Sequence, residues 1–190
     1  MLKHAFKEWA VICRALAEGR QALILRKGGL EEIREGFQLE QTRFWFFPTY
    51  THQQRTGIKP EALPLLEQVE KDRPPEGVVR LSHFAEVGGV YVVHQLPQAL
   101  MLAGLHLWSE ETVRARFAYR RPGLHVLPVR VYRAAETVEL VNTREYEGCR
   151  TWVELERALP TEGAQPVLND ESFREVLRTL DAVLNPTALA

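Results

Sequence analysis

The first residues suited to chemistry follow a short apolar run at residues 22–25. That run leads directly into Arg26, Lys27, Gly28 and Gly29. Backbone N–H groups at glycines can form a concavity that binds anions, and an arginine guanidinium can donate two parallel hydrogen bonds to a phosphate or carboxylate. The segment lacks the glycine and lysine spacing of a P-loop. It therefore predicts either a general anion site or a solvated strand end with a tight turn.

A second polar corner follows the apolar run at residues 44–47 and contains Thr49, His52 and Gln53. His52 is the best-placed candidate for general acid–base catalysis, because the ordinary pKa of imidazole lies near neutrality. No nucleophile is recognisable beside it. The alternative interpretation is a set of hydrogen bonds that hold the loop in place.

A third group interleaves arginines with aromatic residues; its members are Arg114, Arg116, Phe117, Tyr119, Arg120 and Arg121. This pattern is typical of contacts to nucleic-acid phosphates combined with stacking on bases. A helix with its aromatic residues inward and its arginines in solvent would give the same pattern. His106 and Trp108 precede this segment, and they predict either a ligand contact or a buried start of the helix.

The composition bounds the class of protein. The 190 residues are 45% hydrophobic and carry a formal net charge of −1, which indicates an ordinary globular chain without a global signature of nucleic-acid binding. We expect a single domain over residues 1–190, with residues 160–190 as a possible C-terminal helical appendage. Two cysteines, no recognisable signal peptide and no long apolar run predict a cytoplasmic protein without membrane contact. Six histidines and two cysteines show no metal-ligand spacing, so we expect no metal and no cofactor.

Hydrophobic periodicity and turn residues predict the elements that must position these groups. The expected helices lie at 3–18, 60–71, 98–105, 109–119, 151–159 and 170–184. The expected strands lie at 21–26, 37–41, 43–47, 78–87, 90–94, 124–132 and 137–141, with 78–87 and 90–94 forming a hairpin. Because helices and strands do not alternate regularly, we expect an α+β fold with a mainly antiparallel sheet or small barrel flanked by helices.

Several separated motifs occur together in this chain: Glu8-Trp9-Ala10-Val11, Leu25-Arg26-Lys27-Gly28-Gly29, Phe47-Pro48-Thr49 with His52-Gln53, His106 with Trp108, Val113 with Arg116-Phe117, Tyr146 with Gly148-Cys149, and Trp152-Val153-Glu154-Leu155. The chain thereby resembles an uncharacterised bacterial family, domain-of-unknown-function family 1802, over about residues 4–156. The resemblance implies that these motifs belong together, and it brings no activity. In addition, Glu18-Gly19-Arg20 followed by a strand and Arg26 resembles the opening of the ASCH and PUA-like RNA-associated small barrels, which implies a PUA/ASCH-like fold.

The leading functional hypothesis is the binding of a phosphate-bearing ligand, either nucleic acid or nucleotide. Arg26 and Lys27, with Gly28 and Gly29, would hold the anion; the pocket would be lined and extended by Thr49, His52, Gln53, His106, Arg116, Arg120 and Arg121. One alternative is a hydrolase or phosphodiesterase that uses His52 as acid or base, with Glu32 or Glu40 as partner. Another is a structural or protein-interaction domain. A single concave pocket surrounded by Arg26, His52 and Arg116 would favour the first two hypotheses.

Overall fold

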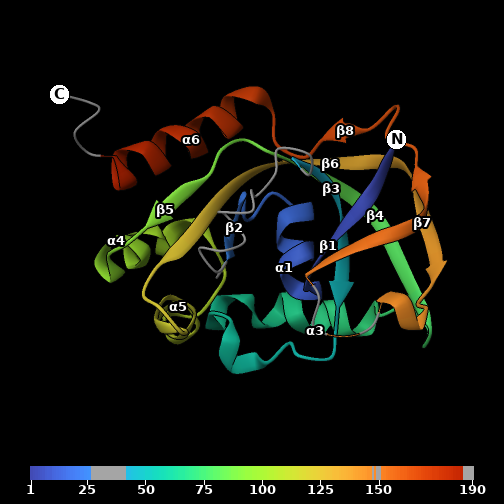
Figure 1. Cartoon of the computed structure of the whole chain (residues 1–190), viewed down its shortest axis with the longest axis horizontal. Coiled ribbons are helices and arrows are strands. Elements are labelled where there is room, and N and C mark those ends of the chain that lie inside the picture. The colour runs from blue at the N-terminus through green and yellow to red at the C-terminus, as the bar shows by residue number, and fades with distance from the viewer. Residues whose placement is uncertain (27–41, 147, 149–150, 186–190) are drawn as a thin grey trace.

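A computed structural model describes residues 1–26, 42–146, 148 and 151–185 (Figure 1). Its strands are β1 (Leu2–Trp9), β2 (Leu23–Arg26), β3 (Arg43–Thr49), β4 (Val78–Val87), β5 (Tyr91–Val93), β6 (Leu124–Val141), β7 (Trp152–Leu159) and β8 (Gln165–Pro166). Its α-helices are α1 (Ala10–Ala17), α3 (Leu63–Lys71), α4 (Leu96–Met101), α5 (Glu110–Ala118) and α6 (Asp170–Leu184). Short 3-10 turns are η2 (Arg55–Gly57), η3 (Pro60–Ala62), η4 (Leu102–Leu105) and η5 (Arg144–Tyr146).

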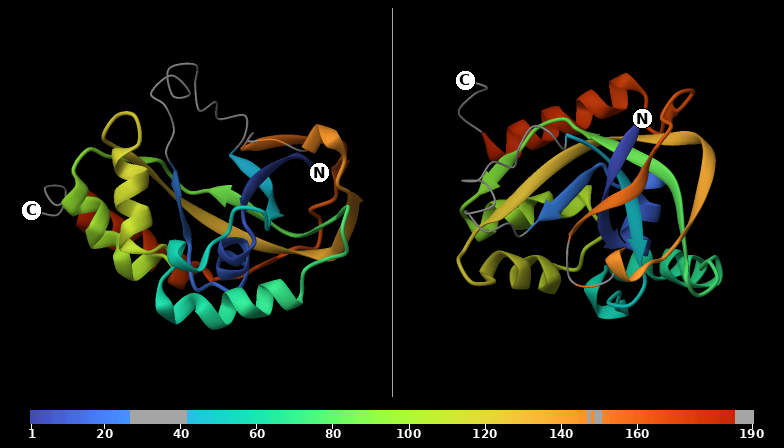
Figure 2. Two further views of the ribbon diagram at one scale, coloured as in Figure 1. Left: turned by 90° about the horizontal axis from the view of Figure 1, so that it is seen from below. Right: turned by 45° about the vertical axis from the view of Figure 1, so that its right-hand side comes forward.

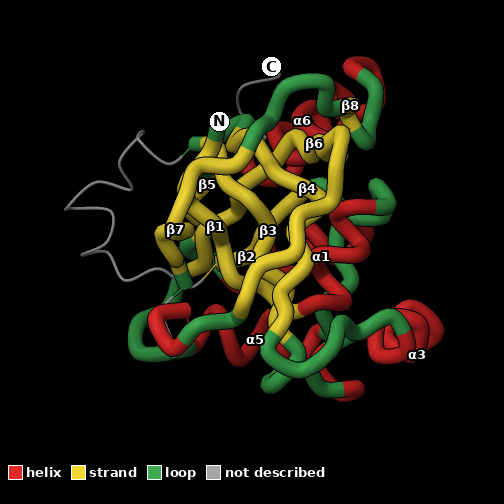
Figure 3. The backbone as a smooth tube through the Cα atoms, turned by 90° about the vertical axis from the view of Figure 1, so that its right-hand side faces the viewer, coloured by secondary structure: helices red, strands yellow, loops and turns green. Residues whose placement is uncertain are grey.

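The strands form one eight-stranded sheet in the order β2-β6-β4-β3-β1-β7, with β5 and β8 also pairing with β6. Among the described strands, β1 and β3 are parallel, and the other pairings are antiparallel. Figure 3 shows the strands as one curved layer with α1 and α3 beside it. The expected α+β fold with a mainly antiparallel sheet is therefore confirmed.

The first element differs from the expectation, because the predicted helix at 3–18 is a strand followed by a shorter helix. Strand β1 lies between β3 and β7 and hydrogen-bonds to both. Its side chains alternate, so that Ala5 joins one buried apolar cluster and Phe6 joins the other. The helical spacing of Phe6 with later apolar residues was thus misleading, since β1 is buried on both faces.

Three further predictions at the level of elements were wrong. Residues 152–159 form the strand β7, because Val153, Leu155 and Leu159 alternate into the core. Strands β4 and β5 form no hairpin with each other, since both pair with β6. Residues 137–141 are the end of β6 itself, which runs for 18 residues.

Helices α5 and α6 each begin directly after a residue whose side chain caps the helix N-terminus. Ser109 caps α5 by accepting a hydrogen bond from the Thr112 N–H at 3.2 Å, and Asn169 caps α6 by accepting one from the Ser172 N–H at 2.8 Å. Helix α6 has the bounds expected from the sequence and buries Phe173 and Leu180. Figure 2 shows α6 and α3 on opposite sides of the strands. Within the described residues, no helix combines the length and the apolar character needed to cross a bilayer.

Candidate ligand-binding pocket

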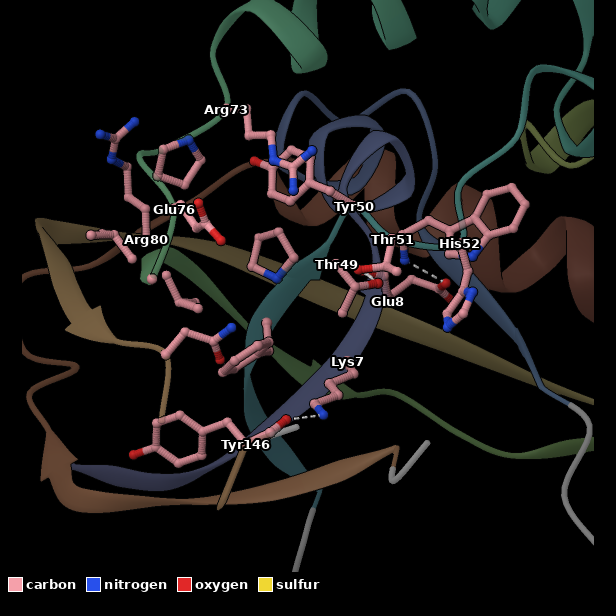
Figure 4. A pocket seen from close by; sticks show the side chains of 18 of the residues that line it. Lys7, Glu8, Thr49, Tyr50, Thr51, His52, Arg73, Glu76, Arg80 and Tyr146 are labelled. Carbon is pink, nitrogen blue, oxygen red and sulfur yellow. Dashed lines mark hydrogen bonds between the residues drawn. The ribbon is translucent and has the colours of Figure 1, made fainter. Parts of the chain in front are cut away.

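An open pocket of about 600 Å³ lies at one edge of the sheet (Figure 4). Parallel pairing of β1 and β3 places the ends of both strands there, with Glu8 opposite Pro48 and Trp9 opposite Thr49. The start of β4 and the end of β6 reach the same edge because Val78 pairs with Val141. The pocket is lined by Lys7, Glu8, Trp9, Phe47, Pro48, Thr49, Tyr50, Thr51, His52, Arg73, Pro74, Pro75, Glu76, Gly77, Val78, Val79, Arg80, Asn142, Tyr146, Gly148 and Thr151.

Backbone contacts hold this edge together. The Thr49 hydroxyl donates to the main-chain oxygen of Glu8 at 3.0 Å, which fastens the end of β3 to β1. Across the pocket, the Asn142 N–H donates to the main-chain oxygen of Gly77 at 2.7 Å. Gly77 has a φ of +76°, a conformation that costs glycine little, so it can make the turn into β4. The pocket thus stands on strand ends that are fixed to one another.

Three cationic side chains line the pocket. The Lys7 ammonium donates to the main-chain oxygens of Tyr146 and Gly148 and lies 5.7 Å from the centre of the Phe47 ring. The Arg73 guanidinium lies 4.9 Å from the centre of the Tyr50 ring. Arg80 donates two hydrogen bonds, at 3.0 and 2.8 Å, to one carboxylate oxygen of the exposed Glu139. Two of the cations therefore lie within cation–π distance of aromatic rings, and the third forms a surface ion pair.

Glu8 is the most unusual of the lining residues, because it is a carboxylate with only 9% of its surface exposed. Its Oε1 accepts a hydrogen bond from the Trp9 N–H at 2.8 Å. Burial raises the pKa of Glu8 above its usual value; the charge of Arg116, the Trp9 N–H and the charge of Arg26 act in the opposite direction. A buried acid with a perturbed pKa at the wall of a pocket is a candidate functional residue.

Behind Glu8 lies a group that we call the inner charged cluster, made of Glu8, Arg26 and Arg116. The Arg116 guanidinium donates to the main-chain oxygen of Leu25 at 2.9 Å and lies 3.7 Å from the centre of the Trp108 ring. Burial lowers the pKa of Arg116, and the charge of Glu8 opposes that shift. Arg26 lies 5.4 Å from the centre of the Phe6 ring and 5.6 Å from that of Trp152. The cluster takes its residues from β1, β2 and α5, and Arg26 also lies over the Trp152 ring of β7.

The residues singled out from the sequence lie in different places. Thr49 and His52 line the pocket. Gln53 instead fastens the loop, since its Oε1 accepts from the Val11 N–H at 3.2 Å and its Nε2 donates to Glu70. Lys27, Gly28 and Gly29 lie outside the described residues, as do Glu32 and Glu40, the proposed partners of His52 in the hydrolase alternative.

The remaining candidates do not line the pocket. Arg26 and Arg116 belong to the inner charged cluster, so of Arg26, His52 and Arg116 only His52 is among the lining residues. His106 is buried, and its pKa is lowered to about 4 chiefly by burial, with the charges of Lys59 and Arg116 contributing. Arg120 and Arg121 are exposed just after α5. The described residues contain no group of three or more His, Cys, Asp or Glu side chains placed to hold a metal ion.

Five charged residues of the pocket did not emerge from sequence reasoning: Lys7, Glu8, Arg73, Glu76 and Arg80. Lys7 and Glu8 fell within the stretch interpreted as a helix, whose apolar stripe includes neither residue. Arg73 fell within a proline-rich connection. The sequence did offer a signal for Glu8, since this residue directly precedes Trp9 in the motif Glu8-Trp9-Ala10-Val11.

The structure defines a mainly antiparallel α+β protein with an open pocket at one sheet edge. Residues 5–179 match the family model described as "Domain of unknown function (DUF1802)", and the chain belongs to this family. A comparison with curated proteins gives no match.

Solved structures similar to this chain include ASCH from Zymomonas mobilis, with 9% identity and a TM-score of 0.46 over 92% of this chain and 93% of that chain. Two mutants of that protein also match. One has 10% identity and a TM-score of 0.45 over 94% and 98% of the two chains. The other has 11% identity and a TM-score of 0.42 over 92% and 94%.

The family motifs meet on the two sides of Glu8. Glu8-Trp9, Phe47-Pro48-Thr49 with His52, and Tyr146 with Gly148 all contribute to the pocket. Arg26, Trp108, Arg116 and Trp152 surround or belong to the inner charged cluster. Glu8 is the residue that the pocket and the cluster share.

Proposed function

We propose that the pocket binds a phosphate-bearing ligand, either a nucleotide or a segment of single-stranded nucleic acid. The observation that carries the proposal is the pocket itself: about 600 Å³ of space bordered by Lys7, Arg73, Arg80 and the imidazole of His52. This volume lies within the range of small-molecule sites, roughly 300–1,000 Å³. Arginine guanidiniums provide the paired donors that phosphate oxygens favour.

The lining also offers surfaces for a base. Trp9, Phe47, Tyr50 and Tyr146 are all lining residues, and aromatic rings stack on bases whatever their sequence. Phe47 and Tyr146 are buried and contact each other with their ring centres 5.7 Å apart, whereas Trp9 and Tyr50 are partly exposed. Trp9 and Tyr50 are therefore the rings that a bound base can reach.

The proposal is tested by titrating the protein with a fluorescein-labelled single-stranded RNA decamer and with mononucleotides at several salt concentrations. We expect binding that weakens with salt, because neutralising phosphates releases counterions. Replacing Arg73 and Arg80 together by alanine should lower the slope of log affinity against log salt for the RNA by up to about 1.4, since each contact to a single strand contributes about 0.7.

The matched control is the double replacement Arg120→Ala and Arg121→Ala, which removes the same charge at the end of α5. If the pocket is the site, this variant binds as the wild type does. Loss of binding in the control, with the Arg73 and Arg80 variant unaffected, would move the site to α5. Absence of binding by the wild-type protein at low salt would refute the proposal. Analysis of the nucleotides after incubation also decides whether they are hydrolysed.

A further inference from the structure

The two sides of the pocket carry different charged groups. Figure 4 shows Arg73, Arg80 and the exposed Glu76 on one side of the pocket, and the buried Glu8 with His52 on the other. A phosphate is attracted to the guanidinium side and repelled by a carboxylate. With both guanidiniums on the other side, the buried Glu8 carboxylate is suited to a part of the ligand that donates hydrogen bonds.

The Glu8 carboxylate has acceptor capacity to spare. Its Oε1 accepts the Trp9 N–H at 2.8 Å, and within the described part of the chain Oε2 accepts no hydrogen bond. The Thr49 hydroxyl, at 3.0 Å, and the Cys13 thiol, at 3.7 Å, donate to the main-chain oxygen of Glu8 and leave its carboxylate alone. Since an ionised carboxylate has about four lone-pair sites, most of them are open to a ligand.

A flat surface accompanies these acceptors. Trp9 lines the pocket next to Glu8, and its ring is held by an edge contact with Trp108 at 4.8 Å between ring centres. Because Trp9 directly follows Glu8 and both line the pocket, a planar ring stacked on Trp9 would have the carboxylate as a neighbouring acceptor. Carboxylates accept from the amino and imino groups of bases, and adjacent donors give two parallel hydrogen bonds.

We propose that Glu8 selects the base of a bound nucleotide and that this base is guanine, whose N1–H and amino group present two donors side by side. The inference rests on the proposed function and adds the identity of the base. Phosphate binds at Arg73 and Arg80, and guanine at Glu8 and Trp9.

The charges around Glu8 favour the ionised form that this recognition needs. Arg116 from α5 and Arg26 from β2 lie behind the carboxylate; Cys13 from α1 contacts its backbone; Lys7 and His52 border the same pocket. Burial nevertheless raises the pKa of Glu8 above 4.5. Because only the carboxylate accepts both donors, the preference for guanine should decline as the pH falls through this raised pKa.

The test is calorimetric titration with the monophosphates of guanosine, inosine, adenosine, cytidine and uridine at neutral pH. Guanosine monophosphate should bind about tenfold to a hundredfold more tightly than the adenosine and uridine compounds, the range of one good bidentate contact. Inosine monophosphate lacks the amino group and should fall in between. The variant Glu8→Gln should lose this preference while retaining its affinity for adenosine monophosphate.

Glu76→Gln is the matched control, because Glu76 also lines the pocket and the change removes the same charge. It should keep the preference for guanine. A second experiment measures the ratio of the guanosine and adenosine monophosphate affinities of the wild-type protein as the pH is lowered. Both nucleotides carry the same phosphate, so protonation of the phosphate affects both affinities and leaves their ratio unchanged. The experiment also needs no variant protein.

The outcomes separate the two proposals. Equal affinity for all five nucleotides, preference for another base, or a ratio unchanged by pH and by Glu8→Gln would overturn the role of Glu8 and leave the proposed function standing. Failure of every nucleotide and of the RNA to bind would overturn the proposed function itself.

Discussion

The charged residues Glu8 and Arg116 lie at and behind the wall of the pocket. Glu8 is buried and Arg116 is partly buried, and within the described residues neither forms an ion pair within 4 Å. Each retains other contacts: Trp9 N–H for Glu8, and the Leu25 oxygen and Trp108 ring for Arg116. Withdrawing ionisable groups from water is costly, and such groups are common at functional sites, which is why Glu8 is central to the proposed base selection.

His106 makes the stability of the fold depend on pH. Its pKa is about 4 in the folded protein and 6.5 when unperturbed, so the unfolded chain binds a proton that the folded chain rejects. Stability should therefore fall as the pH drops from 6.5 towards 4, at about 1.4 kcal/mol per pH unit from this residue. His83, whose pKa is also about 4 and is lowered chiefly by burial, should act in the same direction.

Replacing His106 by glutamine should remove its share of this sensitivity, whatever the change does to stability at neutral pH. Urea unfolding followed by circular dichroism at about pH 7 and about pH 5 would measure it, with an expected reduction in the pH effect of up to about 2 kcal/mol. His94→Gln, at an exposed position, serves as control. An undiminished pH effect in the His106 variant would mean that other groups cause the acid sensitivity.

Residue types and spacing predicted the pocket only in part. Thr49 and His52 could be found because they follow an apolar strand, and strand ends are where sites are commonly placed. Arg80 could not, because it lies in β4, whose pairing with β6 brings together residues about 60 positions apart at the pocket. Arg73 lies in the connection that leads into the same strand, and nothing in its local sequence indicates a site. Surface arginines look alike in a sequence until that pairing is known.

At the scale of elements, local signals predicted helices with caps better than strands. Helix α5 was predicted from its N-cap Ser109 and the acidic residues that follow it, and helix α6 was predicted from its apolar face. Strands β1 and β7 did not, because both combine period-two burial with apolar residues that also fit a helical spacing. Pairing with neighbouring strands decides between these patterns, and pairing partners lie far away in the sequence.

The turn η2 contacts both Trp9 of the pocket and the start of helix α5. A β-carbon at Gly57 would lie 2.5 and 2.6 Å from two carbons of the Trp9 ring. Gly57 cannot easily shift away, because its main-chain oxygen accepts from the Ser109 N–H and from the Thr112 hydroxyl, both at 3.0 Å. Only a residue without a side chain fits between Trp9 and α5.

Gly57→Ala should therefore destabilise the protein by about 1–3 kcal/mol, the usual cost of overpacking, and displace the Trp9 ring from the pocket. Urea midpoints and near-ultraviolet circular dichroism of the tryptophans would measure the two effects. Gly104→Ala is the control, since nothing lies within 4 Å of the added carbon. A midpoint for Gly57→Ala equal to that of the control would show that Trp9 moves freely.

On the scale of the whole molecule, the position of α6 bears on whether residues 160–190 are an appendage. Phe173 and Leu180 are buried, with Leu180 fully so and part of the larger apolar cluster. The Tyr91 hydroxyl donates to Asp181 at 2.7 Å, and Arg130 pairs with Asp170. These contacts tie α6 to β5, β6 and the core, so we predict that the described elements unfold as one cooperative unit.

Two spectroscopic signals can test this prediction, because all four tryptophans, at positions 9, 45, 108 and 152, lie outside α6. Tryptophan fluorescence reports on the strands and on α5, whereas far-ultraviolet circular dichroism also reports on the 15 residues of α6. The two urea transitions should coincide.

Leu180→Ala should shift both transitions to lower urea concentration together, by an amount equivalent to about 2–5 kcal/mol, the cost of emptying a buried leucine site. Arg178→Ala, exposed on the same helix, should leave both unchanged. If the dichroism transition began at lower urea than the fluorescence transition, α6 would be a separately unfolding appendage.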